Sequence, residues 1–202
     1  PQGRIRVDAN GAWDAETAIA RLAVLDRAAD GLEYAEQPCT TVEELRDLRI
    51  TLARKGIDVP VAADESIRKA EDPLRVARLE AADVIVVKVA PLGGVRRALD
   101  VVAETGLPAV VSSALDSSVG IRAGLALAAA LPRLDHACGL ATLGLFDGDV
   151  VTESLVPQGG SISLRSVEPD PELLDRIRAD GTRQAWWADR LRAAHAVLAA
   201  QG

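Results

Sequence analysis

Polar or ionisable residues recur at the ends of short apolar runs, and this recurrence restricts the possible fold more than any other feature of the chain. They lie 28, 28, 24 and 24 residues apart and are Asp8, Glu36, Asp64, Lys88 and Ser112. Longer stretches with apolar residues at helical spacing separate them, so strands and helices alternate. Such alternation predicts a parallel sheet with right-handed crossovers, which is either doubly wound or closed into a barrel.

The spacing favours a barrel. A (β/α)8 barrel of about 250 residues uses about 30 residues for each strand and its helix, and the carboxyl ends of all strands meet at one mouth. A doubly wound sheet opens a crevice only where its strand order reverses, so it would not gather five strand ends. We therefore predict an α/β fold of the barrel type, with the polar strand ends at its mouth.

Cap and turn residues set the bounds of the expected elements. Thr41 and Glu44, for example, have the capping-box spacing at the start of a helix. The expected strands are 4–9, 32–36, 59–63, 84–89, 109–113 and 136–141. The expected helices are 15–29, 41–55, 72–79, 94–104, 118–131 and 183–200, the last of which is expected to pack on the barrel.

Composition excludes several function classes. The net charge is −7 and the basic residues form no cluster, so we expect no nucleic-acid partner. The apolar runs are short and interrupted, so we expect no membrane span. Cys39 and Cys138 lack metal-type spacing and no signal peptide is recognisable, which predicts free thiols in a cytoplasmic protein. The sequence does not indicate an oligomeric state.

Three of the strand ends are acidic, and their convergence has an electrostatic consequence. Two carboxylates about 4 Å apart repel each other by about 4 kcal/mol at an effective dielectric constant of about 20. Asp8, Glu36 and Asp64 therefore need protonation, a paired cation or a metal ion. Hard oxygen ligands suit Mg²⁺, and the lack of His or Cys among them argues against zinc. Single acidic residues after strands are also common helix caps, which is the alternative for each one alone.

Lys88 ends an almost wholly aliphatic strand, next along the chain after the three acids. Burial of an ammonium is costly unless a partner compensates it, and the three acids provide such a partner. Alternation places Lys88 on the inner face with Val84 and Val86. Beside a divalent ion, a lysine can act on a carboxylate substrate that loses its α-proton and forms an enediolate.

These residues stand in motifs that resemble the enolase superfamily, muconate-lactonising subgroup. The motifs are VDANGAW, EYAEQP, AADES and DVIVVKVAPLGG, in the order and spacing of the family's third to sixth barrel strands. Within the subgroup, SSALDSSVG, HACGLATLGLFDGDVV and the late AWW are most similar to its dehydratases. Those enzymes convert 2-succinyl-6-hydroxy-2,4-cyclohexadiene-1-carboxylate to o-succinylbenzoate in menaquinone biosynthesis, by Mg²⁺-dependent syn elimination.

The resemblance implies a role for each matching residue. Asp8, Glu36 and Asp64 would be Mg²⁺ ligands, and Lys88 would be a catalytic lysine that supports the enediolate. The small carboxylate substrate would be held by Ser112, Ser113 and the backbone near Gly139. Asn10 and Glu65 would support the metal ligands from behind. Serine at a strand end also commonly satisfies backbone groups, so this alternative remains open for both serines.

The chain departs from the family pattern in one respect. The family's Lys-x-Lys base, on its second barrel strand, has no counterpart here. The resemblance therefore implies the C-terminal part of a TIM-type (β/α)7β barrel, without the first strands and the α+β capping domain. Residues 1–150 would form barrel strands three to eight with the active site. Residues 151–202 would form an extended segment and helices that pack on the barrel and capping domain.

Two other functions remain open at this point. Similar enzymes racemise N-acylamino acids or epimerise dipeptides, with the lysine of the sixth strand as a second acid or base. Alternatively, the missing Lys-x-Lys is consistent with a degenerate, non-catalytic barrel fragment that serves as a binding or structural module.

Overall fold

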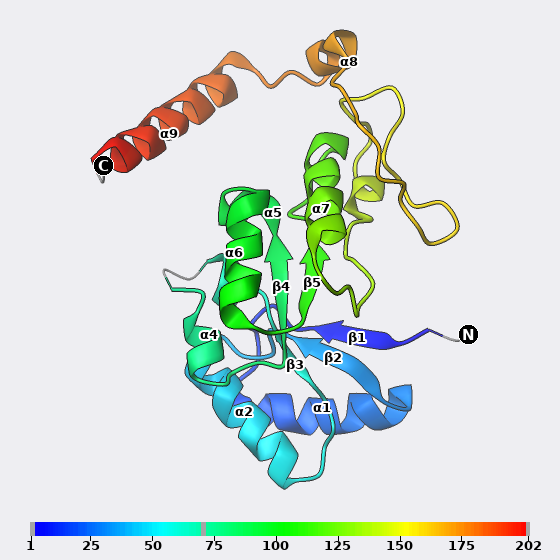
Figure 1. Ribbon diagram of the computed structural model, residues 1–202, viewed down its shortest axis with the longest axis vertical. Coiled ribbons are helices and arrows are strands. Elements are labelled where there is room, and N and C mark those ends of the chain that lie inside the picture. The colour runs from blue at the N-terminus through cyan, green and yellow to red at the C-terminus, as the bar shows by residue number, and fades with distance from the viewer. Residues whose placement is uncertain (1–2, 70–71, 201–202) are drawn as a thin grey trace.

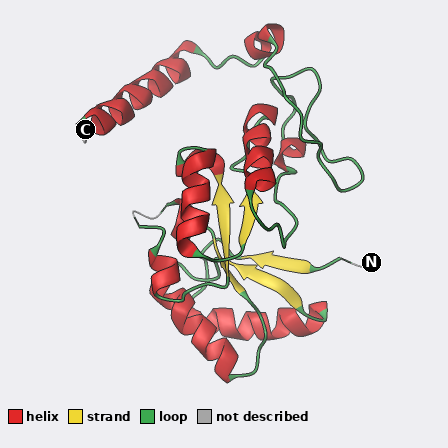
Figure 2. Ribbon diagram, in the orientation of Figure 1, coloured by secondary structure: helices red, strands yellow, loops and turns green. Residues whose placement is uncertain are grey.

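The computed structural model describes residues 3–69 and 72–200 and contains a parallel sheet flanked by helices (Figures 1 and 2). Its five strands follow one another in chain order, so each pairs with the strand that precedes it and the strand that follows. A curved sheet in sequential order is a half-barrel, which confirms the predicted α/β fold class. The strands are β1 (Ile5–Asp8), β2 (Leu32–Glu36), β3 (Val61–Ala63), β4 (Val84–Lys88) and β5 (Ala109–Ser112).

Helices connect successive strands, as the crossover rule requires. Local capping explains where two of the longer ones begin: the Asp14 side chain accepts a hydrogen bond from the Thr17 N–H at 2.7 Å, and Thr41 and Glu44 form the predicted capping box. The helices between strands are α1 (Ala15–Ala29), α2 (Val42–Arg54), α3 (Glu65–Arg68), α4 (Arg75–Arg78), α5 (Val89–Leu92) and α6 (Val95–Thr105). After β5 come α7 (Ser118–Ala130), the 3-10 helix η1 (Thr142–Leu145), α8 (Pro171–Arg176) and α9 (Gly181–Ala199).

Alternation along the strands produces two apolar layers. On β4, Ile85 and Val87 face the helices and join the main core, while Val84 and Val86 face the inside of the half-barrel. This is the orientation predicted from the sequence, and it directs Lys88 to the inner side. The inner layer is small and consists of Tyr34, Ala62, Val84, Val86 and Val110.

Three segments differ from the prediction. Residues 136–141 form no strand; Gly139 makes only an isolated parallel bridge to Ser112. Two four-residue helices, α3 and α5, follow β3 and β4 directly, where a loop and the end of a strand were expected. Elements of one turn carry too little periodicity to be detected in a sequence.

A charged network links β1 to the segment that follows α7. Arg6 Nε donates to Glu33 Oε2 at 2.7 Å, and His136 Nδ1 lies 2.8 Å from Glu33 Oε1. Arg6 also donates to the carbonyl of Ala137 at 2.8 Å. The hydrogen bonds that Glu33 accepts from Arg6 and shares with His136, above all the one from Arg6, hold the pKa of the Glu33 carboxyl below its usual value. The network ties the first strand to the last part of the half-barrel without backbone pairing.

The C-terminal helices lie apart from the core. Neither α8 nor α9 buries a residue, and Trp186 and Trp187 are about half exposed. Figure 1 shows α9 extending away from the sheet at the end of a long connection. The helix buries none of its residues in this structure, and the packing of residues 151–202 on the barrel and capping domain stays a prediction. None of the helices in the described residues combines the length and apolar character needed to cross a membrane.

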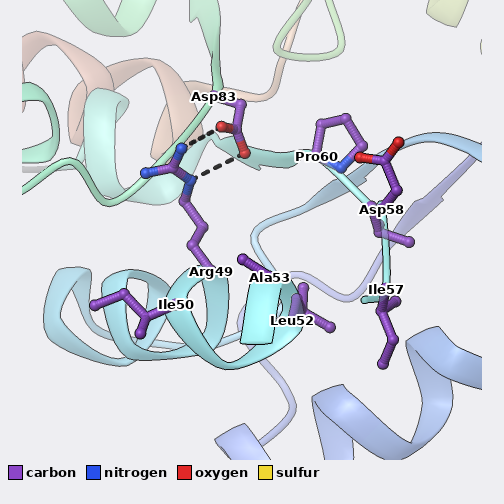
Figure 3. A pocket seen from close by; sticks show the side chains of 9 residues that line it. Arg49, Ile50, Leu52, Ala53, Ile57, Asp58, Pro60 and Asp83 are labelled. Atoms are coloured by element: carbon purple, nitrogen blue, oxygen red, sulfur yellow. Dashed lines mark hydrogen bonds and ion pairs between the residues drawn. The ribbon is translucent and has the colours of Figure 1, made fainter. Parts of the chain in front are cut away.

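At the amino ends of the strands, an ion pair fastens α2 to the sheet (Figure 3). Arg49 Nε donates to Asp83 Oδ2 at 3.0 Å, and Arg49 Nη2 contacts the other carboxylate oxygen. Asp83 also accepts a hydrogen bond from the Val61 N–H at 2.9 Å. Both side chains line a pocket of about 420 Å³ at this end. The first residue of the DVIVVK motif thus stabilises the end of the sheet opposite Lys88.

Replacement of Arg49 should lower stability. We expect Arg49→Ala to reduce the free energy of unfolding by about 1–2 kcal/mol, because the Asp83 carboxylate loses its only charged partner within the described residues. Arg46→Ala on the same helix is the control, since Arg46 forms an exposed ion pair with Asp47, and it should change stability by less than about 0.5 kcal/mol. Urea unfolding of both variants measures the difference, and equal losses would contradict the role given to Arg49.

Candidate active site at the carboxyl ends of the strands

The pairing register brings the predicted residues to one edge of the sheet. Asp8 at the end of β1 is the direct partner of Glu36 at the end of β2, and Lys88 is the partner of Ser112. Asp64 immediately follows β3, which lies between β2 and β4. Parallel strands end at the same edge, so these five residues surround one mouth on the inner side of the half-barrel.

Asp64 is the most deeply buried of the acids. Its side chain is 3% exposed, and each oxygen has a cationic partner: Lys88 Nζ lies 2.6 Å from Oδ2, and Arg68 Nε lies 2.9 Å from Oδ1. The Lys88 side chain is itself only 13% exposed. A buried ion pair that lost one partner would leave an uncompensated charge, so the lysine and the acid depend on each other. Asp64 is therefore the partner that compensates the burial of Lys88 in an apolar strand.

Glu36 lies between the other acids and carries the clearest electrostatic signature. Burial, together with the negative charges of Asp8 and Asp64, raises the pKa of its carboxyl to about 7, while Lys88 opposes the shift. Desolvation and neighbouring negative charges both disfavour the ionised carboxylate. The crowding of carboxylates predicted from the sequence is therefore present in the structure.

The donor set suits a hard divalent cation. Asp8, Glu36, Asp64 and Glu65 contribute only oxygen atoms, and Glu65 Oε2 is buried with no hydrogen-bond partner among the described residues. As the side chains stand, however, no group of three His, Cys, Asp or Glu within residues 3–69 and 72–200 is arranged to hold a metal ion. Both Asp64 oxygens are instead engaged by Lys88 and Arg68.

The two residues predicted to support the ligands are connected to the acids in different ways. Asn10 has a left-handed backbone, φ 49°, and its N–H donates to Asp8 Oδ1 at 2.8 Å. It thus orients Asp8 through its backbone. The Glu65 carboxylate pairs with Arg68, which in turn contacts Asp64. Arg68 therefore connects the two adjacent acids at the start of α3.

The serines at the end of β5 form a hydroxyl cluster with the segment that follows α7. Ser112 Oγ and Ser113 Oγ both donate to the Gly139 carbonyl, at 3.3 and 3.2 Å, and Ser113 Oγ lies 2.6 Å from Thr142 Oγ1. A Cβ at Gly139 would come within 2.7 Å of Ser112 Oγ, so glycine permits this close approach. The serines satisfy backbone groups, as the alternative interpretation allowed, and contact with a substrate remains a prediction.

Three residues of this region were not identified from the sequence: Arg68, Gln37 and Thr142. Arg68 lies four residues after Asp64, a spacing that allows contact only if the intervening turn is helical. Gln37 follows Glu36 in the EYAEQP motif, and its buried side chain bonds to residues near Asp64. Thr142 directly follows the segment that was predicted as a strand, 136–141. Of these three residues, only Gln37 could have been recognised in the sequence, because it is a polar residue between a strand end and a proline.

Comparison with known proteins gives consistent results. Residues 1–170 match the family described as enolase C-terminal domain-like. The chain is 58% identical over 195 residues to an o-succinylbenzoate synthase of Mycolicibacterium smegmatis, covering 96% of this chain. It is 54% identical over 197 residues to one of Thermobifida fusca, covering 98% of this chain. A muconate lactonizing enzyme of Pseudomonas fluorescens, in complex with muconolactone, has a similar structure, with a TM-score of 0.78 and 25% identity over 88% of this chain.

The matched proteins are longer than this chain. It spans 58% of the Mycolicibacterium protein, 59% of the Thermobifida protein and 48% of the Pseudomonas structure. The similarity therefore concerns the part of those proteins that corresponds to the half-barrel and its C-terminal segment.

A methyl group at Gly139 should disturb the hydroxyl cluster. We expect Gly139→Ala to lower the free energy of unfolding by about 1–2 kcal/mol, because the added Cβ displaces the Ser112 hydroxyl from its carbonyl partner. Gly144→Ala is the control, since no atom lies within 4 Å of a Cβ added there. Thermal unfolding compares the two variants, and an unchanged midpoint for Gly139→Ala would show that Ser112 can move at no cost.

Proposed function

The chain belongs to the enolase C-terminal domain-like family, and from this premise we propose that it carries the metal ligands and one catalytic lysine of an o-succinylbenzoate synthase. The observation that carries the proposal is the placement of Asp8, Glu36 and Asp64 beside Lys88 at one edge of the sheet. Identities of 58% and 54% to proteins of that name support it over the other activities of the superfamily. The proposed reaction is the syn dehydration of 2-succinyl-6-hydroxy-2,4-cyclohexadiene-1-carboxylate to o-succinylbenzoate, a step of menaquinone biosynthesis.

Asp8, Glu36 and Asp64 would hold the proposed Mg²⁺. Their oxygen donors, the raised pKa of Glu36 and the unpartnered Glu65 oxygen all support a cation among them. To contribute an oxygen, Asp64 would have to give up Arg68 or Lys88 as a partner. When bound, Mg²⁺ would supply positive charge that stabilises the substrate carboxylate as its α-proton leaves.

Lys88 would stabilise the negative charge that develops on the reacting carboxylate. Its ammonium faces the inner side of the half-barrel and is held by Asp64, so it is already oriented toward the mouth. A preorganised cation stabilises developing negative charge without reorganisation at the moment of reaction. Ser112 and Ser113 would donate hydrogen bonds to the carboxylate or succinyl end of the substrate.

The group that removes the α-proton is proposed to lie outside these 202 residues. The three lysines of the chain are Lys55, Lys69 and Lys88, and no two of them form a Lys-x-Lys pair. The relatives extend beyond the matched region, since the chain spans only 58% of the Mycolicibacterium protein. We therefore propose that the full activity requires a longer protein that contains the base, to which these 202 residues contribute the metal ligands and Lys88.

Magnesium binding tests the site in the chain itself. We expect isothermal titration calorimetry to show saturable Mg²⁺ binding, and Asp64→Asn to weaken it at least about 10-fold because a charged ligand is lost. Asp58→Asn is the control, since Asp58 lines the pocket at the opposite end of the sheet, and it should leave the affinity unchanged. Absence of binding by the unaltered chain would favour a non-catalytic module.

An activity assay tests the reaction and the role of Lys88. In the full product of the gene, Lys88→Ala should reduce dehydration of the cyclohexadiene substrate by about 10²–10³-fold, as expected for loss of a preorganised charge. Lys69→Ala should have little effect, since the Lys69 side chain is 63% exposed. Solvent deuterium exchange at the α-carbon of N-succinylamino acids, without turnover of the cyclohexadiene, would indicate a racemase instead.

A further inference from the structure

We propose that Gln37 is a positioning residue that fixes the spacing between the carboxylates of Glu36 and Asp64, and thereby sets the affinity of the site for Mg²⁺. This inference rests on the proposed function. Gln37 directly follows Glu36 at the end of β2, and no part of it is exposed to solvent. Buried polar side chains at a site of this kind require a full set of partners.

The Gln37 amide connects the end of β2 to the start of α3. Its Oε1 accepts hydrogen bonds from the backbone N–H groups of Asp64 at 3.0 Å and Ser66 at 3.2 Å. Its Nε2 donates to Ser66 Oγ at 2.8 Å and to the Cys39 carbonyl at 2.9 Å. All four hydrogen-bonding positions of the amide are therefore used.

These partners permit only one orientation of the amide. Two backbone N–H groups can only donate, and the Cys39 carbonyl can only accept, so a flipped amide would place donor against donor and acceptor against acceptor. The side chain is consequently held rigidly. It accepts a hydrogen bond from the backbone N–H of Asp64 itself. The position of the Asp64 carboxylate relative to Glu36 therefore follows from the geometry of the Gln37 side chain.

The backbone of Gln37 connects the end of β2 to β3 and to the loop after Asp8. Its N–H donates to the Ala62 carbonyl on β3 at 2.8 Å, and its carbonyl accepts from the Gly11 N–H at 2.7 Å, in the loop after Asp8. Gln37 also has a positive φ of 36°, a conformation that costs energy for a residue other than glycine. Strain of this kind persists where surrounding contacts determine the conformation, and here those contacts reach all three acid-bearing strand ends.

Metal affinity depends on how rigidly the ligands are held, and loss of a residue that orients them typically weakens binding about 10- to 100-fold. Gln37→Met has a similar shape but lacks all four hydrogen bonds, so we expect it to weaken Mg²⁺ binding by about 10-fold or more.

Calorimetric titration of the 202-residue chain with MgCl₂ is the test. It is performed at a temperature where circular dichroism shows each variant to be folded. Ile85→Val is the control, because it destabilises the buried core on the helix-facing side of β4 and should leave the Mg²⁺ affinity unchanged. Hydrogen exchange without metal is the second measurement, and the Asp64 and Ser66 amides should exchange faster in Gln37→Met than in Ile85→Val.

The outcomes separate this inference from the proposed function. If the unaltered chain and Gln37→Met bind Mg²⁺ equally, Gln37 does not position the ligands and the inference alone is overturned. If the Asp64 and Ser66 amides exchange no faster in Gln37→Met than in Ile85→Val, the hydrogen bond to the Asp64 backbone is not the cause and the inference is also overturned. If the unaltered chain binds no Mg²⁺, the proposed cofactor and this inference fail together.

Discussion

Repulsion among carboxylates at the carboxyl ends of neighbouring parallel strands is the constraint on which the rest of this structure depends. Parallel pairing aligns Asp8 with Glu36 and leaves Asp64 one strand further along. The structure offsets the repulsion by placing Lys88 and Arg68 on Asp64 and by raising the pKa of Glu36 to about 7. Cationic partners and a shifted pKa are also the means by which proteins prepare acidic sites for chemistry. The stability of this edge and its proposed function therefore have the same physical origin.

Much of the fold could be predicted because strand spacing and helix caps are local signals. The helix Ala15–Ala29 and the strand Leu32–Glu36 have the predicted bounds, and the capping box at Thr41 is present. The helices α3 and α5 could not be predicted, because an element of one turn has no periodicity. The segment 136–141 is not a strand, because it pairs with β5 over a single residue, Gly139. The position of α9 depends on tertiary contacts, about which helical periodicity gives no information.

In the candidate site, too, some residues could be predicted from the sequence and others could not. Asp8, Glu36, Asp64 and Lys88 could be found because each follows an apolar run, and the register then places them together. Partners such as Arg68 and Thr142 could not be found, because their contacts depend on turns and loops that only the folded chain defines. Residues that touch a reacting centre tend to carry a sequence pattern, whereas residues that hold them in place are recognised from hydrogen bonds.

The ion pair between Arg49 and Asp83 has a consequence for how such a domain can evolve. Asp83 and Lys88 lie at opposite ends of one strand, about 16 Å apart at 3.3 Å per residue. Changes at sites this distant combine almost independently in their effect on stability. New substrate preferences that cost stability at one end of the strands can therefore be compensated by sequence changes at the other. Such separation lets one scaffold diversify into several enzymes while its framework stays intact.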